Sequence, residues 1–165
     1  MHLSVGQELN EEQYFELKQM QERRDCQLKA LDALTRREHG RVELMQKLLL
    51  KGFSKEIIIM VLDDLEAKNL LSDFRYATLL VESRQRKNPE GRFLMSQRLA
   101  SKGVDRETAQ NVLDALFSEE HTREYVQKAY QLALRKYDAQ KAVLVLQKKG
   151  FSSYEIRLGL ERLEG

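Results

Sequence analysis

The sequence predicts an all-α protein built from three tandem three-helix repeats. Helix-breaking residues are scarce, with one proline and eight glycines among 165 residues, and strand-like alternation of apolar residues is rare. A helix-stop cassette also recurs three times, which is typical of a repeat protein. Because each triplet leaves apolar surface that only a neighbouring copy covers, we expect the copies to stack into an elongated array that is free to curve.

The recurring cassette consists of a leucine, a lysine-glycine pair, an apolar residue and a helix-capping residue. The lysine-glycine pairs lie at 51–52, 102–103 and 149–150. The glycine sits just past a helix end, where a left-handed backbone is needed, and the lysine complements the negative end of the helix. The capping residues that open the following helices are Ser54, Asp105 and Ser152, and Glu155 completes a capping box with Ser152.

The remaining helices of each triplet follow from apolar spacing. The first helix of each copy is expected within 25–38, 73–87 and 119–137. Its buried face is marked by Leu28, Leu31 and Leu34 in the first copy and by Phe74, Ala77, Leu80 and Val81 in the second. The third helix carries Ile58, Val61, Leu62 and Leu65 in the first copy, Ala109, Val112, Leu113 and Leu116 in the second, and Ile156, Leu160 and Leu163 in the third. The predicted organisation is a weakly structured or helical acidic extension over 1–22, then repeats over 23–71, 72–117 and 118–165.

Breaks between helices are expected where helix-stopping or capping residues interrupt these patterns. They fall near Gly40, Gly52, Ser72, Pro89-Glu90-Gly91, Gly103, Ser118, Asp138 and Gly150. In the third copy Gly159 replaces a valine, so we expect that helix either to pack closer to its neighbour or to be weaker.

The sequence offers no catalytic, metal-binding or cofactor-binding constellation. His2, His39 and His121 are far apart and follow no metal-ligand spacing, and His39 falls at a predicted helix end, where it complements the helix dipole. Cys26 is the sole cysteine and makes no internal disulfide. No phosphate-binding loop precedes the lysine-glycine pairs. We therefore expect a protein that is not an enzyme and that needs no cofactor.

Basic residues cluster at matching places in the three copies, although the net charge is only +2. A basic stripe of this kind suits phosphates or an acidic protein surface, whereas the alternative for any single residue is an ordinary solvated helix face. The candidate partner- or DNA-binding residues are Arg36, Arg37, Arg41, Lys51, Arg84, Arg86, Arg92, Arg98, Lys102, Lys141, Lys148 and Lys149.

Aromatic residues give little support for stacking on nucleic-acid bases. There is no tryptophan, and Phe53 and Phe151 directly follow the helix stops, where they belong to the core. The tyrosines at 76, 125, 130 and 137 are expected to pack between helices. The longest apolar run, Ile57 to Leu62, is too short for a membrane span. The expectation is a cytoplasmic protein without a membrane segment.

Several ordered motifs resemble the RecX family, the regulators of the bacterial RecA recombinase. An alanine-leucine helix leads into Arg36-Arg37-Glu38 and then Glu43-Leu44, and Lys51-Gly52-Phe53 follows. Further on, Leu70-Leu71-Ser72-Asp73-Phe74-Arg75-Tyr76-Ala77 matches the next family segment. Gly40 stands where the family commonly has serine, which weakens the cap of the following helix. The resemblance covers about residue 26 to the end and supports Arg36 and Arg37 best as contact residues.

The resemblance implies a monomer that lies in the groove of the RecA–DNA filament. It implies regulation, mostly inhibition, of ATP hydrolysis, strand exchange and co-protease activity in recombination, DNA repair and the SOS response, with weak DNA contact. Two alternatives remain open: a helical-repeat protein that binds single-stranded nucleic acid directly, and an adaptor for an unrelated protein.

Overall fold

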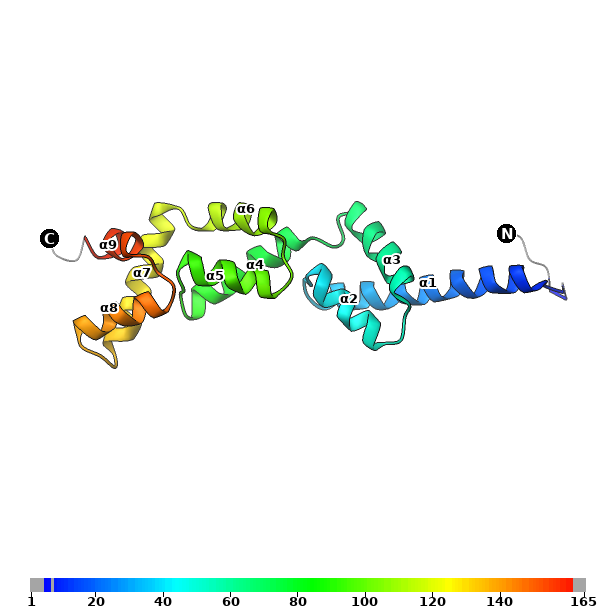
Figure 1. Cartoon of the computed structure of the whole chain (residues 1–165), viewed down its shortest axis with the longest axis horizontal. Helices are drawn as coiled ribbons and strands as arrows, with labels where there is room; N and C mark the ends of the chain where they lie inside the picture. The colour runs from blue at the N-terminus through cyan, green and yellow to red at the C-terminus, as the bar shows by residue number, and fades with distance from the viewer. Residues whose placement is uncertain (1–4, 7, 162–165) are drawn as a thin grey trace. The chain divides into compact units, whose positions relative to one another are not determined.

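The computed structural model describes residues 5–6 and 8–161, and within them it contains helices and no strands (Figure 1). The all-α prediction is confirmed. The helices of this described part are α1 (Glu11–Arg36), α2 (Arg41–Leu50), α3 (Lys55–Ala67), α4 (Asp73–Lys87), α5 (Arg92–Ser101), α6 (Arg106–Leu116), α7 (Glu119–Leu134), α8 (Ala139–Lys148) and α9 (Ser153–Leu160). All predicted breaks lie between these helices.

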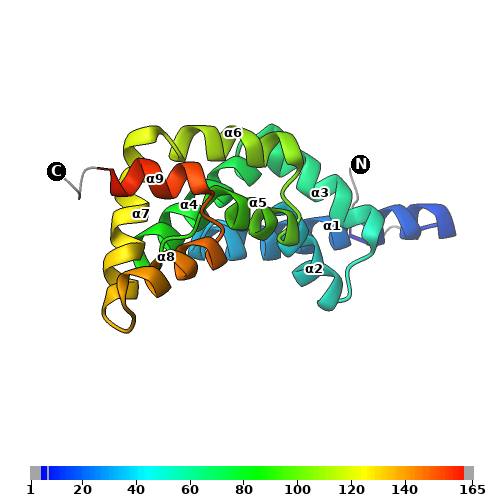
Figure 2. The ribbon, with the colours of Figure 1, turned by 60° about the vertical axis from the view of Figure 1, so that its left-hand side comes forward.

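Contacts between the helices divide the chain into two compact units, residues 1–71 and 72–165. In the first unit α1, α2 and α3 pack together. In the second, α4 and α5 pack on α6, and α7 packs on α8 and α9 (Figure 2). Each triplet has an apolar cluster of its own, centred on Leu44, Leu62 and Leu65 in the first, on Val81, Met95 and Leu99 in the second, and on Val126, Ala129 and Leu146 in the third.

All three cassettes end their helix as predicted. Gly52, Gly103 and Gly150 have φ angles of 88°, 79° and 83°, in the left-handed region that a residue with a Cβ rarely adopts. In the first copy the Gly52 N–H donates to the Leu49 carbonyl, and the Phe53 N–H reaches back to the Leu48 carbonyl. The same pair of hydrogen bonds recurs in the other copies, so each stop is a Schellman motif.

The predicted faces of the third helices are largely confirmed. In α3 the residues Ile58, Val61, Leu62 and Leu65 are buried, and Ala109, Val112 and Leu113 are buried in α6. Leu116 and Leu160 are half-buried, Ile156 is buried, and Leu163 lies outside the described residues.

The first helix of the chain differs from the prediction in length and in its buried face. It begins at Glu11 rather than near Asp25, because Asn10 and Gln13 form a capping box and no breaker interrupts the following residues. Cys26 and Ala30 are buried, whereas Leu28 is 57% exposed. Leu31 and Leu34 pack partly buried against the first core, so the leucine pattern was wrong only at Leu28.

Two other helix-packing predictions were wrong. Phe74 and Tyr137 are exposed, each at 47%, because they face away from the cores of their triplets. Tyr76 is buried as expected, and Tyr125 and Tyr130 are half-buried against the third core.

Two of the three predicted caps form as expected. The side chains of Asp105 and Ser152 accept hydrogen bonds from backbone N–H groups, and Ser152 forms its capping box with Glu155. Ser54 occupies the cap position without a side-chain hydrogen bond. Instead its own N–H donates to the Glu22 carboxylate of α1 at 2.9 Å, which ties the start of α3 to α1.

At Gly91 the backbone of repeat two lies directly against the backbone of repeat three. The Gly91 N–H donates to the Lys149 carbonyl at 2.9 Å. A Cβ on Gly91 would lie 2.0 Å from the Gly150 oxygen, and one on Gly150 would lie 2.6 Å from the Leu94 Cβ. Gly159 packs as closely as predicted, because a Cβ there would meet Val126 at 2.4 Å.

Replacing Gly91 with alanine should therefore destabilise the protein by about 2–4 kcal/mol, because neither the Gly91 loop nor the Gly150 turn can move to make room without breaking the backbone contact. Gly52→Ala is the matched control. It too is a glycine beside a helix end, but nothing lies within 4 Å of its added Cβ, so alanine there should cost only about 1 kcal/mol of backbone strain. Urea unfolding followed by circular dichroism measures both. Equal losses in the two variants would contradict the proposed backbone contact.

Candidate partner-binding site

The two arginines that end α1 both have carboxylate partners. An Arg36 guanidinium nitrogen lies 2.9 Å from the Asp32 carboxylate, one turn earlier on an exposed helix face. Arg37 reaches forward to the Glu43 carboxylate on α2. The first pair is worth little because both side chains are well exposed, whereas the second joins the turn between α1 and α2 to the next helix.

Arg41 and Arg92 occupy the same place in two repeats and make the same contact. Each is the first residue of the second helix of its triplet. Arg41 binds Asp63 at 2.7 Å and also Glu66 on α3, while Arg92 binds Asp114 on α6. Both arginines therefore link the second helix of a repeat to its third helix.

Three of the predicted residues come together in a shallow pocket between α4 and α5. It has a volume of about 360 Å³ and is lined by Leu80, Ser83, Arg84, Lys87, Arg98, Ser101 and Lys102. We call this the α4–α5 pocket. Its lining brings together four cationic side chains and two hydroxyl groups, which are donors that suit phosphate or carboxylate oxygens.

A buried carboxylate holds two of these cations in place. Glu90 lies in the loop between α4 and α5, and its side chain is only 4% exposed. It accepts a hydrogen bond from Arg84 at 2.5 Å and two from Arg98, at 2.5 and 2.8 Å. Both guanidinium groups are thus oriented before any partner arrives.

The loop that carries Glu90 is itself fixed by Gln85. The Gln85 amide donates to the Glu90 carbonyl and accepts from the Glu90 N–H, both at 2.8 Å. Pro89 in the preceding position cannot continue α4, which ends the helix and allows the chain to turn here. Neither Glu90 nor Gln85 was among the predicted site residues.

The charges of the pocket are only partly balanced. Burial raises the pKa of Glu90, but the hydrogen bonds and positive charges of Arg98 and Arg84 outweigh this effect and hold the pKa below its ordinary value of 4.5. Glu90 is therefore ionised at neutral pH. Glu90 contacts two of the four cations that line the pocket, so the pocket keeps a positive excess that an anionic partner would neutralise.

Lys149 of the third repeat joins this network from the other side. Its ammonium contacts the Asn88 side chain just before the Glu90 loop. Burial lowers the pKa of Lys149, Arg84 lowers it further, and Glu90 opposes the shift. This lysine, predicted as a contact residue, lies in the junction between two repeats.

The other predicted residues lie outside the pocket. Lys51 is exposed in the turn that ends α2, and Lys148 is exposed at the end of α8. Lys141 is exposed and lies 3.8 Å from Asp138. Arg86 is exposed on α4, and its carbonyl accepts a hydrogen bond from Lys128 of α7.

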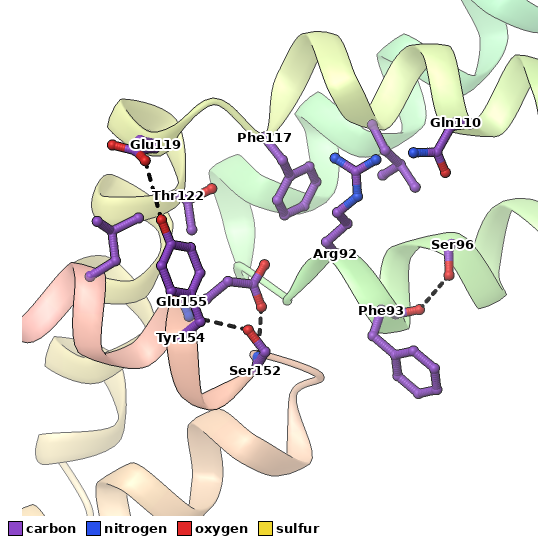
Figure 3. A pocket seen from close by; sticks show the side chains of 12 residues that line it. Arg92, Phe93, Ser96, Gln110, Phe117, Glu119, Thr122, Ser152, Tyr154 and Glu155 are labelled. Atoms are coloured by element: carbon purple, nitrogen blue, oxygen red, sulfur yellow. Dashed lines mark hydrogen bonds between the residues drawn. The ribbon is translucent and has the colours of Figure 1, made fainter.

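A second hollow lies between repeats two and three and is mostly apolar (Figure 3). Phe93 and Tyr154 stand at its rim, and the Tyr154 hydroxyl donates to Glu119 at 3.2 Å. Arg92 also lines it but is already paired with Asp114. Its mostly apolar lining suits contact with another surface. The residues that line it do not bring a nucleophile within reach of a general base.

Cysteine and histidine side chains are often used in catalysis, but Cys26 and His39 are buried in the first repeat. Burial, reinforced by the nearby Glu22 charge, raises the pKa of the Cys26 thiol to about 11. His39 is buried, with Nδ1 3.0 Å from the Arg37 carbonyl and Nε2 2.7 Å from the Lys47 ammonium. His121 is exposed on α7, and His2 lies outside the described residues. No cluster of metal-ligating side chains and no helix long and apolar enough to cross a membrane occurs in the part of the chain that the structure describes.

Fold and site together define a helical-repeat protein that carries a cluster of preoriented cationic side chains. Family models for the first and second three-helix domains of RecX match residues 26–65 and 72–113. The regulatory protein RecX of Prosthecochloris aestuarii is 35% identical over 82% of this chain and 91% of its own. That of Chlorobium limicola is 42% identical over 54% of each chain. This chain belongs to the RecX family. Its fold also matches a crystal structure of regulatory protein RecX with a TM-score of 0.84 at 23% identity, over 96% of this chain and 83% of that one.

Glu90→Gln should lower the free energy of unfolding at pH 7 by about 1–3 kcal/mol, because two partly buried guanidinium groups lose their counter-charge. The wild-type advantage is fully present above the unfolded-state pKa of a glutamate. It should shrink as the pH falls through the lower folded-state pKa of Glu90. Urea unfolding at pH values from 7 down to about 3 measures this. A stability difference that does not depend on pH would contradict the role of the charge.

Proposed function

We propose that this protein binds the RecA–DNA filament and mostly inhibits RecA ATP hydrolysis, strand exchange and co-protease activity. Membership of a family of regulatory proteins supports this proposal. The proposed protein is non-catalytic and cytoplasmic, and its three repeats comprise residues 23–71, 72–117 and 118–165 after an extension over 1–22. Arrangement of these repeats as an elongated array is part of the same proposal.

The proposal is assigned to particular residues by the α4–α5 pocket, whose two arginines are oriented before a partner binds. Lys87 and Lys102 are exposed there, while Glu90 orients Arg84 and Arg98. Cations fixed before binding lose less conformational freedom when they meet carboxylates or phosphates. The proposed contact therefore centres on this pocket. Of the other predicted residues, Arg36, Arg86, Lys51, Lys141 and Lys148 are exposed and extend the candidate surface.

The double variant Lys87→Glu, Lys102→Glu should inhibit RecA about tenfold less strongly than the wild type, since reversing charges at an interface costs on the order of 1–2 kcal/mol. Lys87 and Lys102 are suitable positions because neither holds the Glu90 loop. The measurement is DNA-dependent ATP hydrolysis by RecA, titrated with sub-stoichiometric amounts of each protein.

The matched control is Lys55→Glu, Arg106→Glu, which changes the net charge equally. Both residues are exposed first residues of helices, where an acidic side chain suits the helix dipole. The control should inhibit as the wild type does. An unchanged ATP hydrolysis rate with excess wild-type protein would refute the proposed function, and equal inhibition by both double variants would refute the site.

The alternative function is direct binding of single-stranded nucleic acid, which the four cationic side chains that line the pocket favour. No aromatic side chain lines the pocket for base stacking. We therefore expect binding of a fluorescent oligonucleotide without RecA to be weak. With about three phosphates neutralised, log K should fall with log salt at a slope of roughly −2. Tight binding without RecA that falls steeply as salt rises would favour the alternative function instead.

A further inference from the structure

The α4–α5 pocket carries more positive charge than its own carboxylate balances. Arg84 and Arg98 bind Glu90. Lys87 and Lys102 form no ion pair or hydrogen bond within the part of the chain that the structure describes. Four cationic side chains line the pocket and Glu90 supplies one negative charge, so the excess is three positive charges.

Helix spacing places these cations beside one another. Arg84 and Lys87 are one turn apart on α4, and Arg98 and Lys102 are one turn apart at the end of α5, so each pair shares a helix face. The Nη2 atoms of both arginines reach the same Glu90 oxygen, at 2.5 and 2.8 Å, so the two guanidinium groups lie side by side. Like charges this close repel one another in the free protein, and a bound anion would reverse that cost.

Much of the donor capacity of the two arginines is unused. A guanidinium group carries several N–H donors, and Glu90 accepts only one hydrogen bond from Arg84 and two from Arg98. The Nε atom of Arg84 is buried and has no hydrogen-bond partner among the described residues. A buried donor without a partner costs free energy, so in a residue that lines a pocket it indicates a ligand. The hydroxyl group of Ser83 is a further donor in the lining.

The first repeat shows that this excess is not a general feature of the repeat. When the glycine stops of the first two repeats are aligned, Arg36 and Asp32 correspond to Lys87 and Ser83. Arg36 and Asp32 form an ion pair at 2.9 Å. In the second repeat the cation is retained, but a hydroxyl group stands in place of the acid. The α4–α5 pocket therefore lacks a negative charge that the same helix face has in the first repeat.

The charge and the lining of the pocket suit a phosphate group with two negative charges. A carboxylate or a phosphodiester carries a single negative charge. A terminal phosphate carries about two at neutral pH and presents three strong acceptor oxygens. No aromatic side chain lines the pocket, so it offers no surface on which a base could stack. The pocket is therefore suited to the phosphate itself and not to the group that carries it.

We infer that the α4–α5 pocket binds a terminal phosphate, as carried by a nucleotide or by the 5′ end of a nucleic-acid strand. Arg84 and Arg98, already oriented by Glu90, donate to the phosphate oxygens, and Lys87 and Lys102 supply the remaining positive charge. Because it names the ligand of the pocket used in the proposed function, this assignment rests on that function for its biological role. Phosphate binding itself is measured without RecA, so a failure of one is distinguished from a failure of the other.

Titration of the full chain with small anions at constant ionic strength tests the assignment, with the Nε–H signals of Arg84 and Arg98 followed by NMR. Thymidine 5′-monophosphate should shift both signals and bind about tenfold more tightly than dimethyl phosphate or acetate, which carry one negative charge each. Inorganic phosphate should bind as thymidine 5′-monophosphate does, because the pocket has no surface for a base. Unchanged signals with thymidine 5′-monophosphate, or equal affinity for acetate, would overturn the assignment.

Neutral substitutions place the binding in the pocket. The double variant Lys87→Gln, Lys102→Gln should bind thymidine 5′-monophosphate about tenfold more weakly, since two of its positive charges are gone. Its helical circular dichroism signal should not change, because both side chains are exposed. The matched control Lys55→Gln, Arg106→Gln removes the same charge elsewhere and should bind as the wild type does. Equal affinities of the two double variants would exclude this pocket as the phosphate site.

Short oligonucleotides separate the two sources of the phosphate. A 5′-phosphorylated oligonucleotide should shift the Arg84 and Arg98 signals at lower concentration than the same strand with a 5′-hydroxyl end. If the phosphorylated strand also binds more tightly than thymidine 5′-monophosphate, the strand end is the ligand, and if it binds no more tightly, a free nucleotide is. A 5′-hydroxyl strand that shifts both signals as strongly as the phosphorylated one would overturn the requirement for a terminal phosphate.

Discussion

Each repeat depends on an abrupt end to its second helix. The left-handed glycine turns the chain within a single residue, and the following apolar residue folds back onto the helix it has just left. Because the turn is this short, the third helix begins close enough to cover the core of its repeat. If the second helix ran on by one turn, its apolar side chains would point away from the other two helices.

The parts of the fold that depend on local signals could be predicted from the sequence. The stops at Gly52, Gly103 and Gly150 need only a glycine after a helix, and the third helices need only their apolar spacing. The start of α1 was missed although Asn10 and Gln13 carry a capping signal, because the acidic residues around them were taken for an extension. At Ser54 a glutamate from α1 took over the contact, which spacing along one helix does not indicate.

The site was predicted only in part, for a related reason. Positive charge in step with the repeat identified Arg84, Arg98 and Lys102, which do share a pocket. Charge alone did not separate such residues from Arg41 and Arg92, which link helices of their own repeat. Glu90 was missed because its role arises between two helices. The available signal was an acid placed directly in a Pro-Gly helix break with arginines on both flanking helices.

The contact of Gly91 with the Gly150 turn limits how this chain can be divided or rearranged. The third repeat completes a hydrogen bond of the second, since the Lys149 carbonyl receives the Gly91 N–H. A fragment ending after α6 would leave that buried donor exposed to water, together with the backbone of the Glu90 loop. The second and third repeats therefore form one folding unit, and an exchange of modules between related proteins should keep residues 72–165 together.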